Sequence, residues 1–242
     1  MLLCWALLLV RTARLGYRPG LVLLWVMLAF PVGVGGALGL NQAVLALHRS
    51  SLVGGMSVLG AILACGLFSL AYIRIVLGEA PWRLLDAVSF TFPLATAFGR
   101  VGCLFNGCCF GRVAGPAVPT WLTVPASAYV PPSVAAEYFA GVGPAIRAIN
   151  LPLLFVLAEL VVLLVVEILY RRRDPRLAAG GVFGVAVGLD GLLRLGIEPL
   201  RAEPDLGSSV SWQLLAVLLA VGGLGFAARR WRRADPTAPA RS

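Results

Sequence analysis

The sequence predicts an all-α membrane protein of about seven transmembrane helices, with one extramembrane cap segment. Three observations support this fold class. The chain is 60% hydrophobic and only 13% charged, whereas soluble domains are about 45–50% apolar. Its apolar residues are collected into long uncharged runs, as crossing a bilayer requires. The charged residues fall mostly between these runs.

The predicted helices follow the apolar runs in chain order. The first run is shorter than the roughly 20 residues that a spanning helix needs, and the next two are long enough to tilt. We expect residues 1–242 to form a single integral membrane domain. The expected helices lie near residues 1–10, 21–47, 51–77, 86–106, 151–170, 178–197 and 210–228.

The longest connection, residues 113–150, joins the fourth and fifth predicted helices and is rich in Pro, Gly and Ala. Connections of this length without regular structure are uncommon in compact domains and are often functional. We therefore expect an extramembrane loop or cap here.

The arginines predict the orientation of the chain. All 20 basic residues are arginine, and those between helices collect in alternate connections. By the positive-inside rule, the N-terminus lies outside and the C-terminus in the cytoplasm. The cytoplasmic set is Arg11, Arg14, Arg18, Arg74, Arg83, Arg171, Arg172, Arg173, Arg176, Arg229, Arg230, Arg232, Arg233 and Arg241, against Arg49, Arg112, Arg147 and Arg201 outside.

Composition also excludes several function classes. The net charge of +9 is scattered between apolar spans rather than spread over one face, so we expect no nucleic-acid partner. The five cysteines are too few for a disulfide scaffold and form no Cys-x-x-Cys pair. With a single histidine in the chain, we expect no metal site and no cofactor, and interpret the cysteines as small apolar residues.

One unusual stretch, GRVGCLFNGCCFGR, covers residues 99–112 at the end of the fourth predicted helix. An arginine near a membrane interface costs a few kcal/mol unless it is paired or hydrated. Arg100 could hold a phosphate through two parallel hydrogen bonds, and the glycines allow close backbone approach. The alternative is packing through small residues, with the arginine extending to the interface.

A second stretch, RLGIEPLRAEPD, covers residues 194–205. Arg194, Glu198 and Arg201 are four and three residues apart, so in a helix they share one face, although Pro199 would disturb it. Asp190 precedes Arg194 by four residues, which predicts an ion pair. Both stretches fall at the outer ends of helices and together suit an anionic lipid head group. A structural ion-pair network is the alternative.

At these residues the sequence resembles the prolipoprotein diacylglyceryl transferase family. The resemblance covers most of the chain through RTARLGYRPG, GGMSVLGAILA, GRVGCLFNGCCFGR, GLLRLGIEPLRAEPD and SVSWQLL. The family signature runs Gly-Arg-x-Gly-Asn-Phe-x-Asn-Gly-Glu, and a later Arg-x-x-x-Glu-Phe-x-Arg is also typical. The order and separation of both motifs match here. A branch of relatives with Gly-Cys-Cys-x-Gly in the signature is similar to this chain.

The resemblance implies an inner-membrane enzyme that faces the periplasm, with the cap on that side. Its partners would be the lipid bilayer, phosphatidylglycerol and a lipoprotein precursor, whose lipobox cysteine receives the diacylglyceryl group. By position, Arg100 and Arg194 match the family's essential arginines and are the expected catalytic residues. The resemblance places Asn106, Gly111, Glu198 and Arg201 in substrate binding.

The chain departs from the family pattern in several places: its N-terminal helix is shorter, the element before the fifth helix is reduced to LPLLFVLAE, and three single positions differ. Cys103 replaces the signature asparagine, Cys108 replaces the signature glutamate, and Leu59 aligns with a histidine that is a proposed general base in the family. These departures keep a second interpretation open, namely a catalytically silent relative that binds phospholipid or lipoprotein precursor. A third is a structural bundle whose arginines only form ion pairs.

Overall fold

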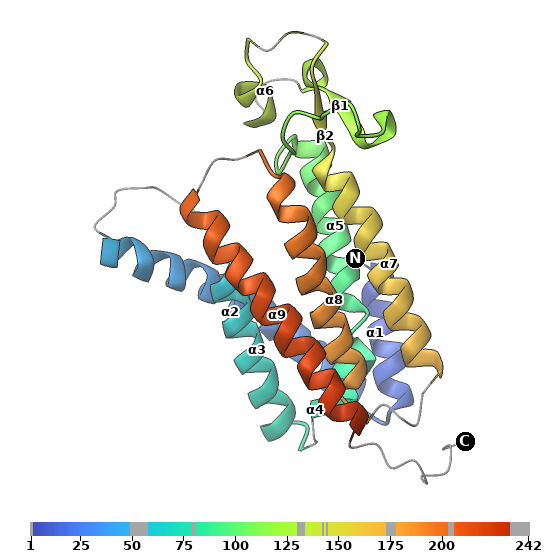
Figure 1. The fold of residues 1–242 in the computed structure, drawn as a ribbon. Helices are drawn as coiled ribbons and strands as arrows, with labels where there is room; N and C mark the ends of the chain where they lie inside the picture. The colour runs from blue at the N-terminus through green and yellow to red at the C-terminus, as the bar shows by residue number, and fades with distance from the viewer. Residues whose placement is uncertain are drawn as a thin grey trace. The chain divides into compact units, whose positions relative to one another are not determined.

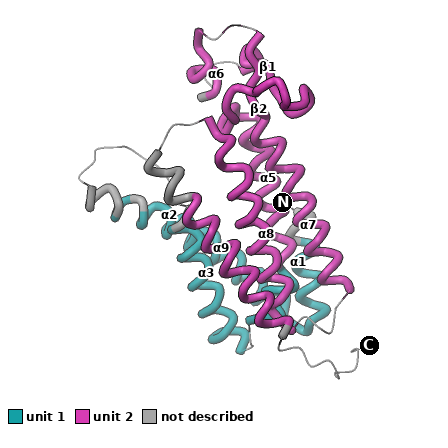
Figure 2. The backbone as a smooth tube through the Cα atoms, viewed as in Figure 1, with its two compact units in different colours: residues 1–88 teal, residues 89–242 magenta. Residues whose placement is uncertain are grey.

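A computed structural model describes residues 2–48, 58–78, 81–129, 134–141, 143, 145–172, 178–202 and 206–232. The described chain is mainly α-helical (Figure 1). It divides into two compact units, residues 1–88 and 89–242 (Figure 2). Every residue assigned above to catalysis or substrate binding lies in the second unit.

The first unit contains α1 (Leu2–Arg14), α2 (Pro19–His48), α3 (Val58–Ile75) and α4 (Pro81–Val88). Helices α2 and α3 approach closely through small residues, because a Cβ on Gly36 would lie 2.5 Å from the carbonyl oxygen of Gly60. The Nε1 of Trp25 also donates a 3.1 Å hydrogen bond to the Ser69 hydroxyl. Such contacts are typical of helices packed within membranes.

The second unit contains α5 (Thr91–Asn106), α7 (Leu151–Arg172), α8 (Gly181–Ile197) and α9 (Leu206–Arg232). Helix α7 packs against both α5 and α8, and α8 packs along α9 (Figure 1). Helices α8 and α9 approach closely, since a Cβ on Gly184 would lie only 2.9 Å from the carbonyl oxygen of Gly223. The absence of side chains at these glycines allows the approach. Helices α5, α7 and α8 therefore pack together, since α5 also contacts α8.

The connection between α5 and α7 is folded over its described residues. Strands β1 (Thr123–Pro125) and β2 (Arg147–Ile149) pair antiparallel, with Thr123 opposite Ile149. Short helices η1 (Thr120–Leu122), η2 (Ala126–Ala128) and α6 (Val134–Tyr138) complete it. This segment lies at one end of α5 and α7 (Figure 1). Its buried core is Phe110, Ala126, Ala135, Phe139 and Ala148.

The all-α membrane fold class is supported by helix length and composition. Among the described residues, four segments are long and apolar enough to cross a membrane: Pro19–Leu40, Pro81–Asn106, Leu151–Arg172 and Gln213–Trp231. Gly60–Ile75 is a shorter apolar helix. The count of seven spans stays a prediction, and residues 51–57 of the third predicted helix lie outside the described residues.

The fourth predicted helix, 86–106, is interrupted in the structure. Helix α4 ends at Val88 and α5 begins at Thr91. Pro93 has no N–H to donate to the carbonyl of Ser89, so an unbroken helix cannot form all its hydrogen bonds there. The neighbouring bond from the Leu94 N–H to the Phe90 carbonyl is long, at 3.4 Å. The structure thus corrects the prediction of one continuous helix.

Candidate functional site

Arg100 lies in the second half of α5 and faces α7. Its guanidinium carbon is 4.1 Å from the centroid of the Phe155 ring, and Phe155 is fully buried. A guanidinium stacked on an aromatic face is held in plane while its N–H groups stay available. Among the described residues, Arg100 makes no hydrogen bond or ion pair. The ring therefore orients a guanidinium whose N–H groups bond to no described residue.

Arg194 forms the ion pair that the sequence predicts. Its Nε donates a 2.8 Å hydrogen bond to Oδ2 of Asp190, one turn earlier on α8. The side chain of Asp190 is only 1% exposed and that of Arg194 is 16% exposed. Arginine has five N–H donors, and this bond uses one of them. The pair therefore fixes the guanidinium and leaves its terminal N–H groups for another acceptor.

Glu159, on α7, was not singled out by the sequence interpretation. It is fully buried, and neither of its carboxyl oxygens has a hydrogen-bond partner among the described residues. Electrostatic interactions link it to Asp190, Arg194 and Arg100. The sequence did contain a signal, because Glu159 is an acid inside the apolar run LPLLFVLAELVVLLVV. An ionisable residue in such a run is by default a functional-site hypothesis.

Arg201 is not in a helix, contrary to the shared helical face predicted for Arg194, Glu198 and Arg201. Helix α8 ends at Ile197, and residues Glu198–Leu200 form the 3-10 helix η3, in which Pro199 sits early. Arg201 and Glu198 nevertheless form an ion pair, because residues three apart lie on the same side of a 3-10 turn. Nη1 of Arg201 lies 3.0 Å from Oε1 of Glu198. Glu198 also interacts electrostatically with Arg194.

The segment after α5 connects the two sequence motifs. Gly111 forms a bridge with Arg201, and the Gly111 N–H donates to the carbonyl of Ile149 at 3.0 Å. A Cβ on Gly111 would lie 2.6 Å from the Cβ of Ile149. With any larger residue at position 111, the two backbones could not come this close. Gly111 thus places Arg201 beside the end of α5. Asn106 ends that helix and is exposed.

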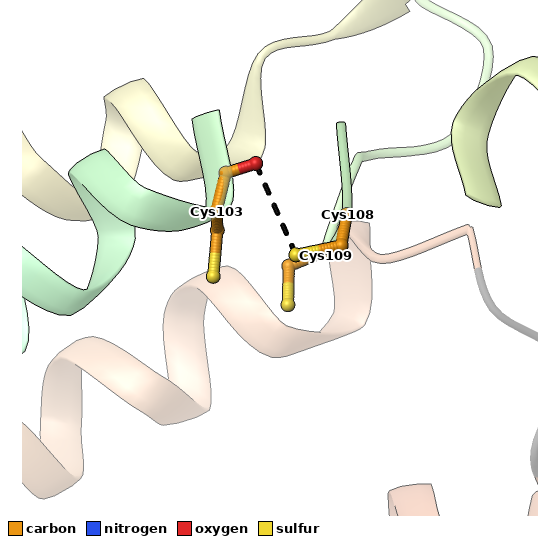
Figure 3. Close-up of side chains that lie close together, drawn as sticks. All are labelled: Cys103, Cys108 and Cys109. Atoms are coloured by element: carbon orange, nitrogen blue, oxygen red, sulfur yellow. Dashed lines mark hydrogen bonds between the residues drawn. The ribbon is translucent and has the colours of Figure 1, made fainter. Parts of the chain in front are cut away.

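Three cysteines come together at this junction (Figure 3). The sulfur atoms of Cys103, Cys108 and Cys109 all lie within 4.8 Å of one another. Nη2 of Arg201 donates to Sγ of Cys109 at 3.6 Å. Burial raises the pKa of the Cys109 thiol to about 12, although Arg201 and Arg100 act to lower it. Burial also raises the pKa of Cys108.

We refer to Arg100, Glu159, Asp190, Arg194, Glu198 and Arg201 as the arginine cluster. Electrostatic interactions join its members across α5, α7, α8 and η3, and link Cys109 to Arg100 and Arg201. Two of the guanidiniums are paired with carboxylates, Arg194 with Asp190 and Arg201 with Glu198. An anion would therefore bind through the N–H donors that these pairs leave over and through Arg100. Four of its members are residues that the sequence analysis assigned to a site, and Glu159 and Asp190 complete it.

A pocket of about 400 Å³ lies beside the strand pair. Its lining includes Arg112, Leu122, Ile149, Leu154 and Leu200, and it is mostly apolar. Arg100, Arg194 and Arg201 do not line it. This pocket is therefore separate from the arginine cluster, although the Arg112 N–H donates to the carbonyl of Leu200 at 2.9 Å.

Comparison with known proteins identifies the family of this chain. The sequence pattern that defines the prolipoprotein diacylglyceryl transferase family matches residues 2–229. A similar protein from Chromobacterium violaceum, named phosphatidylglycerol–prolipoprotein diacylglyceryl transferase, is 42% identical over 72 residues. That alignment covers 30% of this chain and 25% of the relative. Since the family pattern extends over nearly the whole sequence, the chain belongs to the prolipoprotein diacylglyceryl transferase family.

Proposed function

We propose that this chain transfers the diacylglyceryl group of phosphatidylglycerol to the lipobox cysteine thiol of a lipoprotein precursor. The observation that carries the proposal is the arginine cluster. Arg100 and Arg194, on two different helices, interact with the same buried carboxyl group, that of Glu159. Both retain N–H donors that no described residue occupies. Family membership supplies the reaction class.

The chemistry needs a site for a phosphate that becomes more negative as the reaction proceeds. The acceptor sulfur attacks the glyceryl carbon, the bond from that carbon to the phosphate oxygen breaks, and glycerol phosphate leaves with the electron pair. Arginines aimed at that oxygen stabilise the developing charge, which is the largest contribution in many enzymes. We assign this role to Arg100 and Arg194.

The other assigned residues position the substrates. Glu198 holds Arg201 through their ion pair, and Gly111 holds Arg201 against the end of α5. Asn106 is exposed at that same end and is available to a substrate group. Holding two lipidic substrates in a reactive orientation supplies much of the rate in such bimolecular reactions.

The arginine distribution supports a location and an orientation for the chain. We infer a bacterial inner-membrane protein with seven spans, its N-terminus outside, its C-terminus in the cytoplasm and residues 113–150 as a periplasmic cap. The arginine cluster would then lie toward the periplasmic side, where lipoprotein precursors arrive. A cysteine-labelling or protease-protection experiment on right-side-out vesicles tests this orientation.

A second function is favoured by one sequence observation. Leu59 stands where the family has its proposed general base. A chain without a base could bind phosphatidylglycerol or a lipoprotein precursor and perform no transfer. In that case the arginines would still hold the phosphate.

The two functions are separated by one assay. Purified protein in phosphatidylglycerol proteoliposomes is incubated with a labelled lipobox peptide, and lipidated peptide is measured by mass spectrometry. We expect transfer by the unmodified chain, its loss in Arg100→Ala, and its retention in Arg171→Ala, since the Arg171 side chain is 77% exposed. Phospholipid binding that depends on Arg100 without any transfer would instead support the silent relative.

A further inference from the structure

The three cysteines at the end of α5 form a converging set of sulfur ligands. Gly107 ends the helix with φ of 60°, and the N–H groups of Gly107 and Cys108 both donate to the carbonyl of Cys103. This ending, common at helix C-termini, folds the chain back over the last turn. Cys109 then adopts φ of 58°. The reversal brings residues 108 and 109 back to Cys103 (Figure 3).

The geometry of this set is close to that of a metal site. The three sulfur atoms lie within 4.8 Å of one another. With Zn–S bonds of about 2.3 Å in a tetrahedron, sulfur ligands are separated by about 3.8 Å. Small side-chain rotations therefore bring all three to one ion, without movement of the helix. Three thiolates also match the preference of soft thiophilic ions.

The surroundings suit the charge that such a centre would carry. Three thiolates and one Zn²⁺ have a net charge of −1, and a fourth thiolate makes it −2. Arg201 already donates to Sγ of Cys109 at 3.6 Å, and Arg100 interacts electrostatically with the same thiol. Hydrogen bonds from neighbouring groups to ligand atoms orient and stabilise metal centres. Two guanidiniums balance the charge of the four-thiolate state.

We propose that Cys103, Cys108 and Cys109 bind a Zn²⁺ ion whose fourth position takes the thiolate of the acceptor cysteine. Three protein ligands with an open fourth position are the arrangement of catalytic zinc sites. A thiol that coordinates zinc loses its proton outright. The centre therefore performs the activation for which this chain lacks the family histidine, at the positions where Cys103 and Cys108 replace signature residues.

This proposal rests on the proposed function for its substrate, and the reaction remains balanced. The acceptor thiol binds zinc and releases its proton to solvent. The zinc-bound sulfur then attacks the glyceryl carbon, a carbon–sulfur bond forms, and the bond to phosphate oxygen breaks. Glycerol phosphate leaves with the electron pair, and the thioether, a weaker ligand, dissociates from zinc. No oxidant or reductant is required.

The first test measures metal binding without any assay of transfer. The full chain is purified in detergent with a thiol-free reductant, loaded with Zn²⁺, dialysed and analysed for zinc by plasma mass spectrometry. We expect about one Zn²⁺ per chain. The same content is expected for the control Cys65→Ser, because Cys65 lies on α3, in the other unit. Content should fall at least about tenfold in Cys103→Ser/Cys109→Ser.

A second measurement keeps the test decisive if the double variant fails to fold. Co²⁺ added to the unmodified chain should produce intense thiolate-to-cobalt absorption, which iodoacetamide treatment beforehand abolishes. Absence of this absorption together with absence of zinc overturns the site. An unreduced intact mass that is lower by about 2 Da indicates a disulfide. If this loss is absent in Cys103→Ser/Cys109→Ser but present in Cys65→Ser, the disulfide lies within the set and overturns the zinc site.

The metal proposal and the proposed function fail separately. Transfer that is lost on chelation and restored by Zn²⁺ supports both. Zinc binding without transfer at any zinc concentration refutes the transferase function and the activating role of the ion. Undiminished transfer by zinc-free protein refutes the activating role of the ion and leaves the transferase function intact.

Discussion

Two ion pairs in the second unit have the same chemistry but different surroundings. Arg171 and Glu167 on α7 are 2.6 Å apart, and Arg194 and Asp190 on α8 are 2.8 Å apart, both with i,i+4 spacing. The side chains are 77% and 20% exposed in the first pair but 16% and 1% exposed in the second. Spacing therefore predicts the contact, whereas burial separates an interfacial pair from a candidate site.

The difference arises from what packs beside each pair. Arg171 lies in the last turn of α7, among further arginines, where its long side chain can reach water. Asp190 lies on the part of α8 that packs against α7 and Glu159. A buried pair costs desolvation and is rarely kept for stability alone. The position of Arg194–Asp190 therefore suggests a function beyond holding α8 together.

The largest effect should follow from Arg194→Ala. Removing one partner leaves Asp190 buried without its counter-charge, which in other proteins costs about 3–5 kcal/mol. Transfer should fall by at least about 100-fold, because the phosphate loses a donor in the transition state. Thermal unfolding in detergent and the proteoliposome assay measure the two effects.

The matched control is Arg171→Ala, for which we expect less than about 0.5 kcal/mol and unchanged transfer. The double variant Arg194→Ala/Asp190→Asn removes the isolated charge and should recover stability but not transfer. Recovery of transfer in the double variant would contradict the catalytic role of Arg194 and reduce it to a structural partner.

The second prediction compares alanine substitutions at a buried and an exposed glycine. Gly111→Ala places a Cβ 2.6 Å from the Cβ of Ile149 and 2.8 Å from its carbonyl oxygen, so the strand must shift. We expect a loss of about 1–3 kcal/mol and a displaced Arg201. Gly115→Ala is the control, since its Cβ would meet nothing within 4 Å. Equal unfolding temperatures for the two variants would show that Gly111 tolerates a side chain.

The third prediction compares lysine substitutions at two arginines that lie over aromatic rings, and its expected effect is smaller. Arg100 lies 4.1 Å above Phe155 on packed helices, and Arg230 lies 5.0 Å from Phe226 on α9. Arg100→Lys keeps the charge but loses the planar donor pair and the stacking. We expect transfer to fall about tenfold, and the free energy of unfolding to fall by about 1 kcal/mol. Arg230→Lys should alter neither measurement. An active Arg100→Lys would mean that charge alone is required at this position.

The sequence predicted the helices and the Asp190–Arg194 ion pair better than the arrangement around them. Apolar runs and i,i+4 spacing are local features, so the helix positions and the Asp190–Arg194 pair could be predicted from them. The break at 89–90 depends on Pro93, whose effect within an apolar run is not visible in the hydrophobic pattern alone. The end of α8 at Ile197 depends on Pro199. The sequence predicts that this proline disturbs the helix, but not that the chain continues as a 3-10 helix.

The remaining features depend on contacts between distant segments. Nothing in the spacing of Cys103, Cys108 and Cys109 indicates a metal motif. Their convergence comes from the left-handed backbone conformations of Gly107 and Cys109. Glu159 is far in sequence from Asp190 and Arg194, and only the packing of α7 on α8 makes them neighbours. The close approach of Gly111 to Ile149 likewise joins distant segments, and the substrate-binding role of Gly111 stays a prediction.

The smallest expected effect extends the burial argument to the segment between α5 and α7. Tyr129 packs against Phe110 and Phe139, and burial raises the pKa of its phenol. Above about pH 10 the unfolded chain loses this proton before the folded chain does, so stability falls as pH rises, by at most about 1.4 kcal/mol per pH unit. Below that pH the group contributes no slope. The other tyrosines and the cysteines also titrate in this range, and the comparison with Tyr129→Phe subtracts their contribution. Unfolding temperatures from pH 8 to 11 should therefore decline more steeply for the unmodified chain than for Tyr129→Phe, and parallel curves would place the Tyr129 hydroxyl in water.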